Sequence, residues 1–320
     1  MPQSDTIDVR FVHFRSTAGF VVRGGRRFDK PLDVDLHMQR AAWLTAQTEA
    51  ASWGTVQSYD GVGMSCGVIH MIAVNRGHDG QPATQGAPFW RLVRACLDAT
   101  ADVGGLQVLL DEIGWTLGPD GVVVGPRTIA AAGGGALGPV VTGEALRTEL
   151  SGPKGVTPES GPKHERARDY AIACNALMRD PRTFRVQVDA AIRWLVLGHA
   201  AEERAMYGRF AQPAASTPDL ATLRSDVLPP AADLAMCVYH SFSVNAPSEA
   251  LRQARQSLAF STAHHDPIAV ARSLCVALGT DHYARWPTRY EHIRRVARGC
   301  GLWAPELVDR VMPRLQGVGA

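Results

Sequence analysis

The chain has 320 residues, of which 46% are hydrophobic and 20% charged, and its 33 basic and 31 acidic side chains give a formal net charge of +2. This is ordinary globular composition, long enough for one large domain or two small ones. The near-balance of charge argues against a nucleic-acid-binding surface as the main feature of the chain, so we expect no nucleic-acid partner.

The N-terminal part predicts a small β element. Residues 7–28 contain two apolar stretches separated by Ala18 and Gly19, which is typical of two short strands, and we expect residues 1–35 to form an N-terminal β arm. A helix is expected to follow, because LHMQRAAWLTAQTEAAS is rich in alanine and places apolar residues at helical spacing. Glu49 falls in the last turn of this helix, and Trp53-Gly54 ends it.

Residues 55–71 contain three glycines and alternate only loosely, so they predict a turn and a hairpin rather than a further helix. Most of the remaining chain is helical by pattern, with an internal linker expected over 211–231. The expected fold is therefore mostly α, in the α+β class, with residues 36–320 as one helical domain and a small β-hairpin beside the Glu49 helix.

The stretch Gly63-Met64-Ser65-Cys66-Gly67 matches G-x-S-x-G, the nucleophile elbow of serine hydrolases. An elbow needs a buried strand before the serine and a helix after it, whereas Tyr59-Asp60-Gly61-Val62 cannot make a buried parallel strand. The expected elements also do not alternate between strands and helices, as a parallel sheet requires. A serine hydrolase using Ser65 is the least favoured alternative.

Glu49 offers a different interpretation. A carboxyl group at a helix C-terminus faces the negative end of the helix dipole, and burial beside Trp53 would act in the same direction, so both favour the protonated form that a general acid needs. Asp60 follows eleven residues later and Ser65 five residues after that. A helix-borne glutamate facing a hairpin that carries an aspartate and a hydroxyl is a glycosidase arrangement.

These residues carry a family resemblance. Glu49, Asp60 and Ser65-Cys66-Gly67-Val68-Ile69-His70 resemble the phage-type lysozymes, which have a glutamate at a helix end, an aspartate, and Thr-x-Gly-x-x-His on a β-hairpin. The stretch is also similar to the broader lysozyme-like superfamily, including chitosanases and lytic transglycosylases. The resemblance covers about residues 36–75. It departs from the phage pattern in that Asp60 lies two residues further from the glutamate and serine replaces threonine.

The resemblance implies a two-lobed lysozyme-like fold with Glu49 as general acid. Asp60 would position or activate a water molecule, and Ser65 would hold that water. The expected substrate-binding residues include Gly67 and His70, which lie on the hairpin. His70 would also be a structural partner of the hairpin. Trp53 and Tyr59 complete the set, since aromatic faces stack on sugar rings, although a core role fits both residues equally well.

The expected activity is cleavage of β-1,4 linkages in peptidoglycan, as in a muramidase or endolysin with an antimicrobial, cell-wall-degrading role. A chitosanase is one alternative. A cell-wall-binding or phage or injection-particle structural protein that keeps the fold without turnover is another. We expect a polysaccharide partner, no cofactor and no metal.

The six cysteines are scattered singly without a C-x-x-C pair, which is neither a zinc pattern nor a dense disulfide framework, so we expect free, mostly buried thiols.

The N-terminus MPQSDTIDVRF lacks a signal-peptide pattern, and no run approaches about 18 apolar residues, so neither a secretory signal nor a membrane span is expected. Synthesis in the cytoplasm, with delivery to the cell wall by another route, is the expected localisation.

Overall fold

The structure is a computed structural model, and it describes residues 7–14, 17–49, 52–57, 64–72, 88–102, 105–112, 115–118, 121–124, 162–197, 219–243, 266–283 and 287–315. The chain divides into two compact units, residues 1–27 with 50–190 and residues 28–49 with 191–320. The described elements are mostly helices with small antiparallel sheets, which confirms the α+β class. The sequence-based boundary at residue 35 stays a prediction.

The first unit contains a five-stranded sheet in the order β1-β2-β3-β4-β5. Its strands are β1 (Asp8–Phe14), β2 (Thr17–Arg23), β3 (Val56–Gln57), β4 (Ser65–Cys66) and β5 (Met71–Ile72). Every pairing is antiparallel, and Val22 of β2 lies opposite Val56 of β3, with both side chains fully buried. The two expected strands in residues 7–28 and the hairpin in residues 55–71 are thereby confirmed, and they belong to one sheet.

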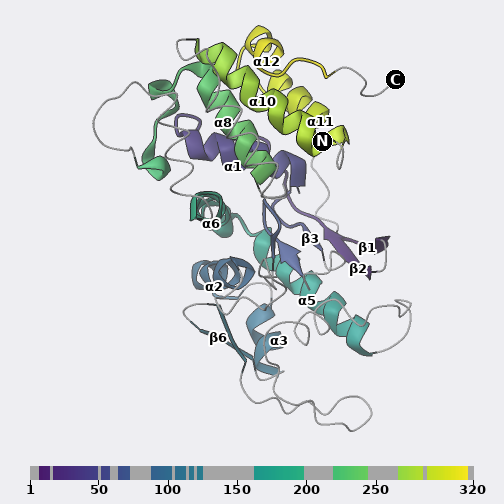
Figure 1. Cartoon of the computed structure of the whole chain (residues 1–320). Coiled ribbons are helices and arrows are strands. Elements are labelled where there is room, and N and C mark those ends of the chain that lie inside the picture. Colours follow the sequence, from purple (N-terminus) through teal and green to yellow (C-terminus); the bar gives the residue numbers. More distant parts are fainter. Residues whose placement is uncertain are drawn as a thin grey trace. The chain divides into compact units, whose positions relative to one another are not determined.

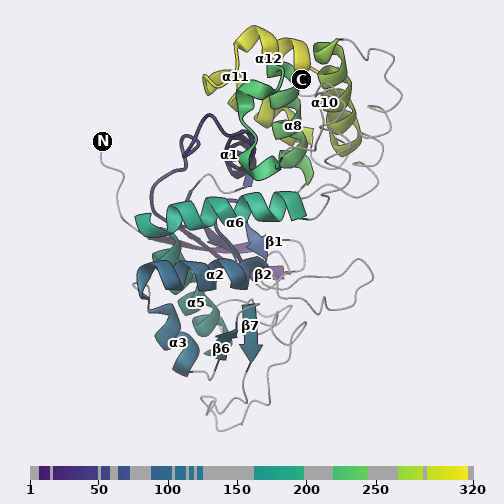
Figure 2. The ribbon, with the colours of Figure 1, turned by 90° about the vertical axis from the view of Figure 1, so that its left-hand side faces the viewer.

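Helices pack against this sheet. The helices in contact with it are α2 (Pro88–Thr100) and α5 (Pro162–Met178). The first unit also contains α3 (Leu106–Glu112), which packs on α5, and the short η1 (Pro181–Thr183), which contacts α2, while α6 (Phe184–Leu197) continues from the first unit into the second. α5 contacts β2, β3 and β4, and α2 contacts β5. The hairpin of β6 (Trp115–Gly118) and β7 (Gly121–Val124) lies beside α2 and α3 (Figure 2).

The second unit is helical in its described part, and α1 lies in its core. It contains α1 (His37–Glu49), η2 (Leu220–Thr222), η3 (Ser225–Val227), α8 (Pro230–Ser243), α10 (Pro267–Tyr283), α11 (Pro287–Gly299) and α12 (Pro305–Val311). Helix α1 packs along α8 and also contacts α11, while α10 packs on α8, α11 and α12 (Figure 1). Nine of the first ten residues of α1 are buried, so this helix has almost no solvent face over most of its length.

Several helix starts are set by proline. α2, α5, α8, α10, α11 and α12 each begin at a proline, which has no amide hydrogen to satisfy and a backbone angle already suited to the first helical position. Residues 219–231, at the C-terminal end of the expected linker, include η2 and η3, which pack against the start of α1 through the bonds His37 N to Leu223 O, 2.9 Å, and Ser225 N to Asp35 O, 2.7 Å. None of the described helices combines the length and apolar character needed to cross a membrane.

Candidate functional site

Glu49 is the last residue of α1, which agrees with the predicted position in the last turn, and its carboxylate is anchored by Arg289. Arg289 of α11 donates from Nη2 to Glu49 Oε1 at 2.5 Å, and both side chains are 11% exposed. The same nitrogen lies 3.1 Å from Thr48 Oγ1 and 2.5 Å from the carbonyl oxygen of Ser241 in α8. Arg289 therefore ties the end of α1 to α8 and α11.

The C-terminal end of α1 has two partners from α11. Besides Arg289, His292 donates from Nε2 to the carbonyl oxygen of Gln47 at 3.0 Å, which satisfies one of the carbonyl groups that a helix end leaves open. A cation at a helix C-terminus interacts favourably with the helix dipole. Arg289 thus opposes the negative helix-end potential on which the sequence argument for Glu49 relied. It is 240 residues away from Glu49 in the chain, so only the fold reveals it.

The hairpin residues lie in the first unit. Ser65 is fully buried in β4, opposite Gln57 of β3 and Ile72 of β5. The turn that follows runs from Gly67 to His70, whose amide donates to the Gly67 carbonyl at 3.2 Å. Gly67 has φ +77°, and a Cβ there would stand 2.8 Å from Cδ2 of Leu92, so both backbone angle and space require glycine. His70 also adopts a left-handed φ of 53°, which is uncommon for a residue with a side chain.

This geometry does not have the form of a nucleophile elbow. Ser65 lies within a two-residue antiparallel strand, and the chain leaves it through a tight turn into β5 instead of entering a helix. A nucleophile elbow needs a strand–turn–helix connection that exposes the serine at the top of a sheet. The described residues around Ser65 have neither that connection nor that exposure.

Of the two aromatic candidates, Trp53 lies within the described residues. Trp53 is 2% exposed and stacks on Phe184, with ring centroids 4.1 Å apart and planes 9° from parallel. One face of its indole is therefore covered by the half-buried Phe184 ring, and the burial of Trp53 agrees with the core role that the sequence left open. Tyr59 and Asp60 lie outside the described residues. Trp53, Ser65, Gly67 and His70 belong to the first unit and Glu49 to the second.

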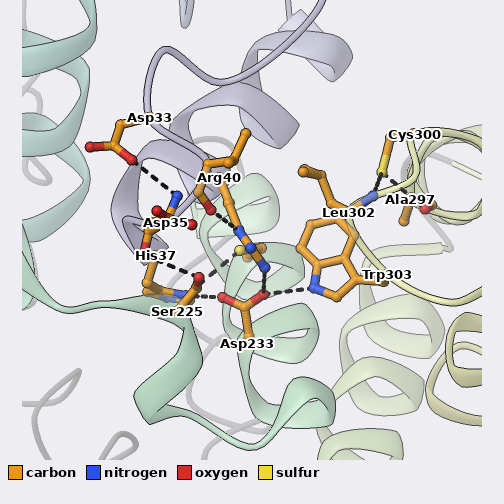
Figure 3. A network of polar contacts seen from close by, with 12 residues as sticks. Asp33, Asp35, His37, Arg40, Ser225, Asp233, Ala297, Cys300, Leu302 and Trp303 are labelled. Atoms are coloured by element: carbon orange, nitrogen blue, oxygen red, sulfur yellow. Dashed lines mark hydrogen bonds and ion pairs between the residues drawn. The ribbon is translucent and has the colours of Figure 1, made fainter.

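A buried polar network in the second unit was not anticipated from sequence (Figure 3). The Asp233 carboxylate, 1% exposed, accepts hydrogen bonds from His37 Nδ1 at 2.7 Å, Arg40 Nη1 at 2.9 Å and Trp303 Nε1 at 2.7 Å. Burial acts to raise the pKa of Asp233, but the His37 hydrogen bond, the charges of His37 and Arg40 and the Trp303 hydrogen bond outweigh it, so the pKa is lowered.

The network anchors the other end of α1. His37 and Arg40 lie in its first turn, Asp233 lies in the first turn of α8, and Trp303 precedes α12. Together with the Arg289 contacts at Glu49, this holds α1 at both ends. His37 and Arg40 are nearly 200 residues away from Asp233 in sequence, and no local pattern marks the contact.

Three possible metal-ligand atoms lie within 4.8 Å of one another, one each from His37, Asp233 and Cys237. Both Asp233 oxygens already accept hydrogen bonds, and Arg40 brings a cation to one of them. Burial, followed by the Asp233 charge, raises the pKa of the Cys237 thiol, which disfavours the thiolate that metal binding needs. The contacts are those of a satisfied hydrogen-bond network, and we assign no metal to it.

A cavity of about 890 Å³ adjoins this network within the second unit. Its apolar wall includes Leu228, Ile268 and Leu307, and Trp303 and Asp233 form part of its lining. Its charged lining carries both signs, from Asp35, Asp226, Asp266, Arg40 and Arg224. Arg224 is engaged with Asp226 through bonds of 3.1 and 3.2 Å, so the cavity presents no single strong charge.

Comparison of the chain with family models, with curated proteins and with solved structures found no match. The residues and their contacts are therefore the basis for a functional proposal.

Proposed function

We propose that this chain is a glycoside hydrolase that cleaves β-1,4 linkages of an aminosugar polymer, with peptidoglycan as the first substrate to test. The observation that carries the proposal is the position of Glu49, at the end of a buried helix that is held at both ends and followed within the chain by the β3–β4–β5 hairpins. The lysozyme-like resemblance of residues 49–70 supplies the reaction class.

The rigidity of α1 supports this role. A general acid must stay within a fraction of an ångström of its productive position, and a carboxyl group held by packing and hydrogen bonds meets that need better than one on a free side chain. Glu49 is 11% exposed and bonded through Oε1 to Arg289, which is itself bonded to α8.

The second catalytic group in this proposal is Asp60, as the resemblance implies, acting on a water molecule or on the developing oxocarbenium charge. The distance between the two carboxyl groups decides the stereochemistry, with about 5 Å typical of retaining and about 6.5–9.5 Å of inverting enzymes. Reducing-end anomer analysis by NMR would therefore assign the mechanism directly.

The test is the substitution Glu49→Gln, with Glu306→Gln, an exposed glutamate of α12, as the matched control. The amide keeps size and can still accept from Arg289, but it cannot donate the proton. General acid catalysis contributes about 10²–10⁴ in rate, so turnover should fall by at least two orders of magnitude while binding to insoluble polymer persists.

The measurement is release of reducing ends from purified peptidoglycan and, in parallel, from chitosan, well below the melting temperature of either variant. A parent-like rate for Glu49→Gln, or an equal loss in Glu306→Gln, would remove Glu49 from the mechanism. Activity on chitosan alone would assign the chitosanase alternative.

One observation favours a second function, a non-catalytic cell-wall-binding or particle protein with this fold. Arg289 already gives the Glu49 carboxylate a structural role in joining α1 to α11, which requires no turnover. This alternative predicts polymer binding without any release of reducing ends, and binding that Glu49→Gln leaves intact.

A further inference from the structure

The second unit contains a strongly basic pocket, which is formed by the C-terminal half of α11, by α12 and by the residues that follow α12. All of its lining residues are far from Glu49 in the sequence. Its volume is about 610 Å³, and its lining consists of four arginines, one aspartate and one glycine: Arg294, Arg295, Arg298, Arg314, Asp309 and Gly299. The cavity described above mixes both signs of charge, whereas this pocket is dominated by one sign.

Two of these arginines have structural roles. Arg294, whose side chain is 12% exposed, donates from Nη2 to Asp309 Oδ1 at 2.5 Å and from Nε to the carbonyl oxygen of Met312 at 2.8 Å. Arg298 donates from Nε to Asp309 Oδ2 at 3.2 Å. Both oxygens of the one carboxylate in the lining are therefore occupied, and Asp309 holds Arg294 and Arg298 in place.

The other two arginines have no such role. Within the described ranges, neither Arg295 nor Arg314 has a hydrogen bond or an ion pair, and both are exposed at the pocket. Fold stability does not explain why two further cations are placed beside Arg294 and Arg298.

The charge remains positive when nearby negative groups are counted. Glu291, 3.7 Å from Arg294 Nη1, adds a second carboxylate, and the C-terminus of α11 contributes roughly half a negative charge. Four guanidinium groups against two carboxylates and this partial charge leave an excess of more than one positive charge. Like charges that line one pocket repel one another, and a bound anion would relieve that repulsion.

We infer that this pocket binds a phosphate group, either free or carried on a polymer. Guanidinium groups present paired donors whose planar geometry matches phosphate oxygens, and several of them around one concavity are the usual means of recognising a multivalent oxyanion. Arg295 and Arg314 make the adjustable contacts, while Arg294 and Arg298 are held in place by Asp309. The inference does not depend on Glu49 or on hydrolysis.

The test is isothermal titration of the full chain with inorganic pyrophosphate at fixed ionic strength, using the double variant Arg295→Gln/Arg314→Gln. The matched control is Arg272→Gln/Arg310→Gln, which removes the same charge from exposed positions of α10 and α12 outside the pocket lining. The parent should bind with a saturable isotherm. The pocket variant should weaken binding by at least about tenfold, because two charged donors are lost, while the control stays within about twofold.

A second arm replaces pyrophosphate with a poly(glycerol phosphate) chain and separates the two sources of phosphate. Binding of both probes through the pocket assigns a general phosphate site, and binding of the polymer alone assigns a polymer-borne one. If neither probe binds, or if the control variant loses affinity as much as the pocket variant, the inference is wrong. Reducing-end release, measured in parallel, should be the same for Arg272→Gln/Arg310→Gln and the parent.

Discussion

Replacing Asp233 with asparagine tests the anchor at the start of α1. The carboxylate accepts bonds of 2.7, 2.9 and 2.7 Å from His37, Arg40 and Trp303. An amide offers one oxygen and one NH₂ group, so at least one of these donors would face another donor, and Arg40 would lose its counter-charge. Breaking a buried ion pair by removing one partner costs about 3–5 kcal/mol.

The expected loss lies near the lower end of that range because Arg40 is 17% exposed and can recover some hydration. We expect a fall of about 3 kcal/mol in the free energy of unfolding, a large share of the ~5–15 kcal/mol typical of a domain. For a unit of this size, such a loss corresponds to a decrease of about 6–12 °C in melting temperature.

The assay is thermal unfolding followed by circular dichroism, with Asp226→Asn as the control. Asp226 also pairs with an arginine, but its side chain is 65% exposed, so its replacement should leave the transition unchanged. Equal transitions for the parent and Asp233→Asn would refute the anchoring role, as would an equal decrease in the control.

Acid provides a second readout of the same group. Because the folded-state pKa of Asp233 is lowered, its ionised form contributes stability that is present above the unfolded-state pKa of about 3.9 and is lost as pH falls through the folded value. The stability difference between the parent and Asp233→Asn should therefore be constant near neutral pH and shrink below about pH 4. A difference that grows on acidification would contradict this sign.

Two further predictions concern the core. Burial raises the pKa of the Cys174 thiol to about 12 and also raises the pKa of the other five thiols, and five of the six cysteines are buried. A disulfide reagent at neutral pH should therefore label the half-buried Cys300 first and the other cysteines only after unfolding. Rapid labelling of Cys174 in the native state would be inconsistent with the packing. At Gly279, an added Cβ would lie 2.5 Å from Cδ2 of the buried Tyr290 ring. Gly279→Ala should lower the free energy of unfolding in a urea titration, because overpacking costs about 1–3 kcal/mol and exceeds the ~1 kcal/mol gain in helix propensity. Gly299→Ala, where an added Cβ has nothing within 4 Å, should be neutral or stabilising in the same titration.

The elements that sequence predicted well are those with local causes. The Ala-rich pattern and Trp53-Gly54 predicted the helix that ends at Glu49, and the glycines of residues 61–67 predicted a turn and hairpin rather than a helix. The sequence also disfavoured an elbow at Ser65, because the residues before it cannot form a buried parallel strand, and the antiparallel β4 agrees.

The electrostatic setting of Glu49 could not be predicted in the same way. The helix dipole at Glu49 follows from neighbours in the chain, whereas Arg289 and His292 belong to α11 and reach the end of α1 only through tertiary packing. The Asp233 network and the arginine pocket have the same origin, since each joins side chains from several helices. Arg294, Arg295 and Arg298 are close together in sequence, but only the position of Asp309 and Arg314 beside them makes a pocket.

The central claim is that the chain hydrolyses an aminosugar polymer using Glu49. The most direct measurement is mass spectrometry of the soluble products released from purified peptidoglycan by the parent chain and by Glu49→Gln. We expect the parent to yield fragments with new aminosugar reducing ends and the variant to yield at most about a hundredth as many in the same time. Peptidoglycan that is bound by the parent chain but yields no new reducing ends would contradict the claim.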